Sequence, residues 1–182
     1  PLDGSVRIHG AKNSVLPILA ACLLAPGECV IHNCPELSDV AASLDILRHL
    51  GCRAERQGDA VVVDASAPTG WDVPDALMRE MRSSVIFLGA ILGRMGRAEL
   101  CAPGGCELGP RPIDLHLGAI RGLGGRITED GGGLRAEGAL RGADLVLSLP
   151  SVGATENAML AAVCAAGTTT ITNAAREPEI VR

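Results

Sequence analysis

Apolar residues gather into short runs along this chain, and each run has polar residues before it and a glycine after it. Residues 15–25 and 158–166 are apolar at almost every position, which is typical of helices buried on all sides. Pro17 is compatible with the first turn of such a helix, where backbone N–H groups have no intrahelical partner. The polar starts are typical helix caps, and the glycines are typical helix ends. The caps stand at Asn13/Ser14, Ser83/Ser84 and Thr155/Glu156, and the glycines at Gly27, Gly96 and Gly167.

The pattern between these helices predicts short strands and a second, amphipathic kind of helix. Each glycine is followed by a strand-like segment, and in the first two cases an amphipathic helix and then a β-hairpin come next. The strands are expected at 29–33, 98–102 and 168–173, the helices at 37–51 and 114–124, and the hairpins at 52–65 and 125–138.

This series of elements returns roughly every 70 residues, opening at Lys12, Arg82 and Thr155. A repeat of that length indicates a domain built from similar units. We expect an α/β (α+β) fold of β-α-β-α-β-β units, with Val6–His9 as the first opening strand. The units cover about 1–70, 71–143 and 144–182 of a single domain. By this period the third unit is incomplete, and some 35 to 40 further residues are expected after it.

Three buried helices packed together would bring their N-termini to one end of the domain. Backbone N–H groups there, with Lys12 and Arg82, would favour an anion such as a phosphate or carboxylate group. The alternative is that the polar residues only cap their helices. Lys12 is the single lysine among 16 Lys and Arg residues, although a chance surface lysine is the simpler interpretation of that stretch alone.

Composition excludes several classes of protein. The net charge of −5 and an aromatic content of 1% argue against binding to nucleic acid. No apolar run reaches the length of a membrane span. The seven cysteines are odd in number and lack CxxC spacing, which favours buried thiols in a reducing cytoplasm. Zinc at Cys29/Cys34 and Cys101/Cys106 is a weak alternative, so we expect neither a metal nor a cofactor.

The segment 101–118 interrupts the repeat with glycines, prolines and Cys106. Arg111 stands nearby and could stabilise a reactive thiolate, although an incidental surface cysteine and a surface ion pair are equally compatible with the local sequence. Pro110 and Pro112 stiffen the backbone around Arg111, which suits an arginine that holds an oxyanion. The stretch 150–157, "PSVGATEN", has the small residues of a phosphate-binding turn before a helix. His116 is a modest site candidate, whereas the other histidines are expected to be structural.

Five motifs in order carry a resemblance over essentially the whole chain: "GAKNSVLPIL", "MRSS", "PGGCELGPRPIDLH", "PSVGATEN" and "TNAAREPEIV". With them the chain resembles the N-terminal part of the UDP-N-acetylglucosamine 1-carboxyvinyltransferases, a family of enolpyruvyl transferases. The resemblance implies an inside-out α/β barrel of two similar domains with the active site between them. The second domain, with an aspartate general base and a further phosphate-binding arginine, is missing here, so residues 1–182 alone should be inactive.

The resemblance also implies a reaction and roles for residues. The family transfers the enolpyruvyl group of phosphoenolpyruvate to the 3′-hydroxyl of UDP-N-acetylglucosamine in peptidoglycan synthesis, through a tetrahedral ketal. Lys12, Arg82 and Arg111 would bind the anionic groups of phosphoenolpyruvate, and Cys106 would protonate the enol carbon or form an adduct, also with fosfomycin. The nucleotide sugar would be bound by Asn13, Pro112, Ile113, Asp114, Leu115, His116, Ser151, Val152 and Gly153, and Leu149 stands where some relatives carry a lysine.

Two other functions remain open at this point. An enolpyruvyl transferase with another acceptor, such as shikimate 3-phosphate, would share the fold, although "PGGC" and "RPIDLH" favour the nucleotide sugar. A non-catalytic binding domain is the alternative from a different class.

Overall fold

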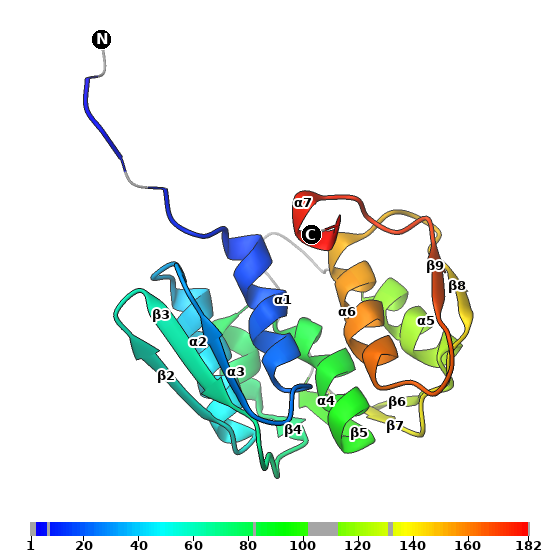
Figure 1. The fold of residues 1–182 in the computed structure, drawn as a ribbon. Coiled ribbons are helices and arrows are strands. Elements are labelled where there is room, and N and C mark those ends of the chain that lie inside the picture. Colours follow the sequence, from blue (N-terminus) through cyan, green and yellow to red (C-terminus); the bar gives the residue numbers. More distant parts are fainter. Residues whose placement is uncertain (1–2, 7, 82, 102–112, 131–132, 182) are drawn as a thin grey trace.

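The protein is described by a computed structural model, which covers residues 3–6, 8–81, 83–101, 113–130 and 133–181. Within these residues three β-sheets are arranged around the helices α1, α4 and α6 (Figure 1). The α and β content agrees with the α+β class that the sequence predicts. The inside-out barrel and the boundaries of the repeat units stay predictions.

The first sheet has the order β1-β3-β2, and both of its pairings are antiparallel. The predicted hairpin at 52–65 is therefore confirmed, and its inward-facing valines, Val61 and Val63, are fully buried. The elements of this part are α1 (Lys12–Cys22), β1 (Glu28–Ile31), α2 (Ser38–His49), β2 (Arg53–Gln57) and β3 (Ala60–Asp64).

The second sheet has the order β4-β5-β7-β6, in which β4 pairs parallel with β5 and the other pairings are antiparallel. The third pairs β8 with β9 in parallel. The elements are β4 (Asp72–Val73), α3 (Asp75–Glu80), the 3₁₀ helix η1 (Ser84–Ile86), α4 (Phe87–Met95), β5 (Arg97–Cys101), α5 (Asp114–Gly122), β6 (Arg126–Asp130), β7 (Gly133–Glu137), β8 (Asp144–Val146), α6 (Val152–Val163), β9 (Thr170–Thr172) and α7 (Pro178–Val181).

The strand expected at Val6–His9 is wrong for the residues of that segment that the structure describes. Val6 and Ile8 are 83% and 79% exposed and lie in a segment that extends away from the rest of the chain (Figure 1). The later sheets each contain a parallel pair, β4 with β5 and β8 with β9, whereas β1 pairs only with β3 among the described residues. A strand needs hydrogen-bonded neighbours, and this segment has none there.

Two predicted helix starts also need correction. Helix α6 begins at Val152, where the Ser151 hydroxyl accepts a hydrogen bond from the N–H of Ala154. Thr155 is therefore not a cap but a buried residue of the first turns, and its hydroxyl donates to the carbonyl of Ser151. Helix α1 begins at Lys12 after Ala11, so Asn13 and Ser14 lie in its first turn and are not its caps. Pro17 lies in the second turn, and the carbonyl of Asn13 consequently loses its intrahelical donor.

Glycines allow α4 and α6 to pack at very close range. A Cβ atom at Gly89 would overlap the backbone carbonyl and the Oδ1 atom of Asn157, and one at Gly93 would lie 3.3 Å from the Cβ of Cys164. Helix α1 contacts both α4 and α6, so the three predicted buried helices do form one packed group. Their N-terminal ends lie near one another, around a shared cavity.

Candidate functional site

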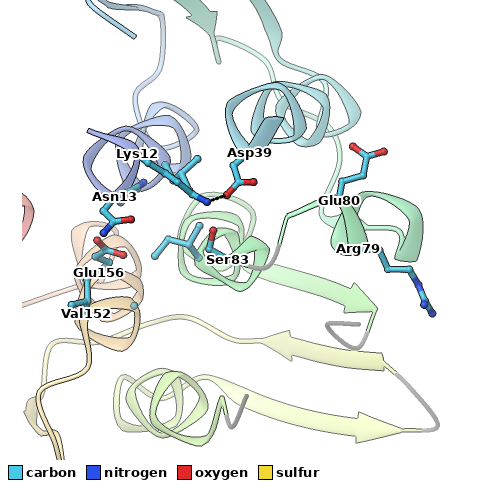
Figure 2. A pocket seen from close by; sticks show the side chains of 12 residues that line it. Lys12, Asn13, Asp39, Arg79, Glu80, Ser83, Val152 and Glu156 are labelled. Atoms are coloured by element: carbon cyan, nitrogen blue, oxygen red, sulfur yellow. Dashed lines mark ion pairs between the residues drawn. The ribbon is translucent and has the colours of Figure 1, made fainter. Parts of the chain in front are cut away.

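A cavity of about 700 Å³ lies where the starts of three helices meet. Its walls come from the first turns of α1 and α6, from the start of η1, and from α2 and α3 (Figure 2). The lining residues are Lys12, Asn13, Leu16, Pro17, Asp39, Arg79, Glu80, Ser83, Ile86, Val152, Gly153 and Glu156. The expected convergence of helix N-termini is therefore present in the structure.

Lys12 forms an ion pair with Asp39, which belongs to the first turn of α2 (Figure 2). The Lys12 side chain is 53% exposed and that of Asp39 18%, so water reaches the ammonium and an exchange of its partner costs little. The sequence did not reveal this partner. An acidic residue in the first turn of a helix interacts favourably with the helix dipole, so Asp39 gave no reason to expect a further partner. In this structure the ammonium of Lys12 is balanced by a carboxylate.

The other charged groups of the lining are mostly acidic. Arg79 bonds to Asp75 at 2.7 Å and points away from Lys12 in Figure 2. Glu156 is partly buried, and its Oε1 atom has no hydrogen-bond partner among the described residues. Burial, helped by the nearby Glu179 and Glu177, raises the pKa of Glu156 from 4.5 to about 7. Anion binding at this cavity therefore needs cations beyond those of the described lining.

His116 lies beside the start of α6, although its own element is α5. Its Nδ1 atom is 3.1 Å from the Nδ2 atom of the buried Asn157. A Cβ atom at Gly153 would lie only 3.1 Å from the Cε1 atom of His116. Burial lowers the pKa of His116 from 6.5 to about 4, against the opposing charge of Asp114. The predicted segments 113–116 and 151–153 are thus brought together through His116 and Gly153.

The predicted site residues fall into two groups. The structure places Lys12, Asn13, Val152 and Gly153 on the cavity wall, Ser151 at the cap of α6, and Ile113, Asp114, Leu115 and His116 at the start of α5. Arg82, Cys106, Arg111 and Pro112 lie outside the described residues. Sequence reasoning missed Asp39 and Asn157, and it treated Glu156 only as a cap.

Metal-ligand groups and membrane-spanning helices bear on the class of the site. Across the described part of the chain, no three or more His, Cys, Asp or Glu side chains are grouped so as to hold a metal ion. None of the helices in that part combines the length and hydropathy that a membrane crossing requires.

Relatives with known names share this sequence over nearly its whole length. UDP-N-acetylglucosamine 1-carboxyvinyltransferase 2 of Caldanaerobacter subterraneus is 53% identical over 180 residues, which is 98% of this chain and 43% of the relative. The UDP-N-acetylglucosamine 1-carboxyvinyltransferase of Cellvibrio japonicus is 45% identical over 184 residues, covering 100% of this chain and 44% of the relative. The chain thus spans less than half the length of these curated relatives.

Solved structures agree with the sequence relatives. The enolpyruvyl transferase NikO from Streptomyces tendae superposes with a TM-score of 0.86 at 26% identity, over 98% of this chain and 42% of NikO. EPSP synthase from Acinetobacter baumannii shares the fold, with a TM-score of 0.74 at 17% identity, over 97% of this chain and 42% of that structure.

The family comparison covers the complete sequence. The sequence model of the family described as EPSP synthase (3-phosphoshikimate 1-carboxyvinyltransferase) matches residues 1–182. Together with the named relatives, this match confirms the resemblance that the five motifs indicate. The chain belongs to the EPSP synthase family of enolpyruvyl transferases.

Proposed function

We propose that this chain forms one side of the active site of an enzyme that transfers the enolpyruvyl group of phosphoenolpyruvate to the 3′-hydroxyl of UDP-N-acetylglucosamine. The observation that carries the proposal is the cavity at the convergent helix starts, with Lys12 and Asn13 on its wall. Relatives at 45–53% identity that bear the name of this activity support it. Peptidoglycan synthesis in the cytoplasm is the cellular role that we infer from the same relatives.

The proposed reaction is an addition followed by an elimination. The enol carbon of phosphoenolpyruvate takes a proton, for which Cys106 is the proposed donor, and the sugar 3′-oxygen bonds to the neighbouring carbon as its own proton leaves. The resulting tetrahedral ketal then loses a proton and expels phosphate, which restores the double bond. We propose that Arg82 and Arg111 bind the phosphate and carboxylate groups together with Lys12.

The charges of the described cavity lining support the proposal that Arg82 and Arg111 bind the anionic groups of phosphoenolpyruvate. In the described lining, Lys12 and Arg79 are outnumbered by Asp39, Glu80 and Glu156, and Arg79 is already paired with Asp75. An incoming anion must therefore draw Lys12 away from Asp39 and must find additional cations. A single ammonium suits this exchange, since it can donate in three directions to a group whose geometry changes during reaction.

Labelling with fosfomycin tests the proposal at the thiol. The complete gene product is treated with fosfomycin, with and without UDP-N-acetylglucosamine, and the adduct is located by mass spectrometry. We expect modification at Cys106 that the nucleotide sugar promotes, whereas exposed Cys164 serves as an internal control and should show no such promotion. An unmodified Cys106 in the folded protein would contradict the proposal.

Two further experiments test which acceptor is used and whether residues 1–182 are active alone. Phosphate release with shikimate 3-phosphate instead of the nucleotide sugar would establish the alternative acceptor. We further propose that residues 1–182 alone have negligible turnover, because they span only 42–44% of the length of their relatives. A measurable rate with this piece would contradict that statement without affecting the choice of acceptor.

A further inference from the structure

Asn157 is fully buried in the helix packing, and two backbone groups fix the orientation of its amide. Its Oδ1 atom accepts a hydrogen bond from the N–H of Gly89 at 2.6 Å, and its Nδ2 atom donates to the carbonyl of Val85 at 2.9 Å. Rotation of the amide by half a turn would place donor against donor and acceptor against acceptor. The positions of the amide oxygen and nitrogen are therefore determined by the fold.

This orientation also determines the protonation of His116. The Nδ2 atom of Asn157 lies 3.1 Å from the Nδ1 atom of His116, and an amide nitrogen can only donate. The Nδ1 atom must therefore carry a lone pair, and the ring proton must be on Nε2. A charged imidazolium would carry N–H groups on both nitrogens and would lose this bond. Burial of His116 acts in the same direction, since it disfavours the charged form.

The other edge of the ring lies against the first turn of α6. A Cβ atom at Gly153 would lie 3.1 Å from Cε1 and 3.4 Å from Nε2 of His116, so a side chain there would require the imidazole to shift by a few tenths of an ångström. Gly153 also lines the cavity. The Nε2–H donor of His116 consequently lies beside a helix start whose backbone N–H groups also offer hydrogens to an acceptor.

We propose that Asn157 is a positioning residue that holds His116 in its neutral Nε2–H form, so that His116 donates a hydrogen bond to an acceptor oxygen of the nucleotide sugar. The identity of the ligand rests on the proposed function, whereas the tautomer rests on the packing alone. An uncharged donor selects an oxygen by its position rather than by its charge. His116 thereby contributes to orientation and leaves neutralisation of the anion to Lys12 and the arginines.

Nitrogen NMR of the complete gene product with labelled histidine measures this tautomer directly, at pH 7 and without any substrate. The His116 signals are assigned by their loss in His116→Gln. We expect one protonated nitrogen, Nε2, and one unprotonated nitrogen, Nδ1. In Asn157→Asp the donor becomes an acceptor, and the proton should move to Nδ1 or occupy both nitrogens. Asn173→Asp is the matched control, since that amide donates to the carbonyl of Leu147 at 2.9 Å, and its His116 spectrum should stay unchanged.

Kinetics then connect the tautomer to the ligand. We expect Asn157→Asp to raise the KM for UDP-N-acetylglucosamine roughly tenfold, as the loss of one hydrogen bond would, while the KM for phosphoenolpyruvate stays unchanged. A wild-type His116 protonated at Nδ1 would overturn the proposal even if the variant failed to fold, and so would an unaltered spectrum in Asn157→Asp. The expected spectra without turnover of the nucleotide sugar would support the tautomer and contradict the proposed function.

Discussion

Two polar arrangements, one on the wall of the cavity and one in the helix packing beside Gly153 of that wall, differ in almost every physical respect. Lys12 and Asp39 form a charged pair whose side chains are 53% and 18% exposed. Asn157 and His116 form a neutral pair, in which Asn157 is fully buried and tied to the backbone of two residues of the η1–α4 segment. An exposed ion pair contributes roughly 0–1 kcal/mol, whereas a buried polar group left unpaired costs about 1–3 kcal/mol.

Under the proposed function, this difference gives the two arrangements different tasks. The ammonium of Lys12 can leave Asp39 for an arriving anion at little cost. Asn157 cannot exchange its partners without leaving buried backbone groups unpaired, and it therefore keeps the ring of His116 in place. An adjustable charge and a fixed neutral donor are what a site requires when it must both attract an anion and orient an acceptor. The two arrangements should therefore respond differently to substitution.

The largest effect is expected from Lys12→Arg. The guanidinium keeps the charge, but its planar fork would hold Asp39 in one geometry and could not follow an anion as it changes shape. In the complete gene product we expect kcat/KM to fall roughly 100-fold with stability unchanged. Phosphate release measures the rate, and Arg135→Lys, at an exposed pair with Glu99, is the matched control that should keep wild-type activity. Near wild-type turnover of Lys12→Arg would contradict the adjustable role of Lys12.

The second prediction concerns the fixed arrangement. In Gly89→Ala the added Cβ would overlap the carbonyl and Oδ1 of Asn157, so that α4 and α6 must separate. We expect a loss of about 3 kcal/mol in the free energy of unfolding, measured with urea. Gly118→Ala in α5 is the control, because a Cβ there meets nothing within 4 Å and should stabilise the helix by about 0.5–1 kcal/mol. Equal effects at both glycines would refute the close packing.

The third prediction uses pH to separate Glu156 from His116. The folded pKa of Glu156, about 7, lies above its ordinary value of 4.5, so the folded state binds more protons and stability falls as pH rises through this window. The folded pKa of His116, about 4, lies below its ordinary 6.5, so stability falls as pH drops through that window. Between pH 4.5 and 6.5 the two groups therefore change the free energy of unfolding in opposite directions as the pH changes.

Urea titrations at several pH values measure how the free energy of unfolding depends on pH. Glu156→Gln should lose more stability on acidification from pH 6.5 to 4.5 than the wild type does, whereas His116→Gln should gain stability over the same range. Parallel pH profiles of the two variants would contradict the environments assigned to these side chains.

The smallest effect on stability is expected from Asp39→Asn. The substitution removes the charge that balances Lys12, yet the pair should contribute less than about 1 kcal/mol to the free energy of unfolding, because its ammonium is 53% exposed to water. At the same time inorganic phosphate should bind more tightly, because Lys12 no longer has a competing carboxylate. A loss of several kcal/mol, measured by urea denaturation, would show that the pair is structural and would remove the contrast with Asn157.

Much of the fold follows from local patterns in the sequence. The buried helices and both hairpins depend on residues close together in the chain, where hydrophobic period and glycine positions are informative. Helix α3 and strand β4 are too short to produce such a pattern. The segment at Val6–His9 has strand-like residues, but a strand also requires a neighbour that the local sequence cannot reveal.

The site was less predictable than the fold. The apolar runs indicated the buried helices, although the cap-like residues at Asn13/Ser14 and Thr155/Glu156 lie inside their helices rather than at the starts. The convergence of the helices followed from their buried faces. The partner of Lys12 comes from a different element, α2, and nothing in the local sequence pairs the two residues. Asn157 resembles any polar residue near a helix start, and its role depends on Val85 and Gly89, which reach it only after α4 packs on α6.

Phosphate release by the complete gene product measures both the choice of acceptor and the contribution of Lys12. The rate is compared with phosphoenolpyruvate plus UDP-N-acetylglucosamine and with phosphoenolpyruvate plus shikimate 3-phosphate, for the wild type and for Lys12→Arg. The proposed function predicts release only with the nucleotide sugar and a large loss in the variant. Release only with shikimate 3-phosphate, or with neither acceptor in a folded wild-type protein, would contradict it.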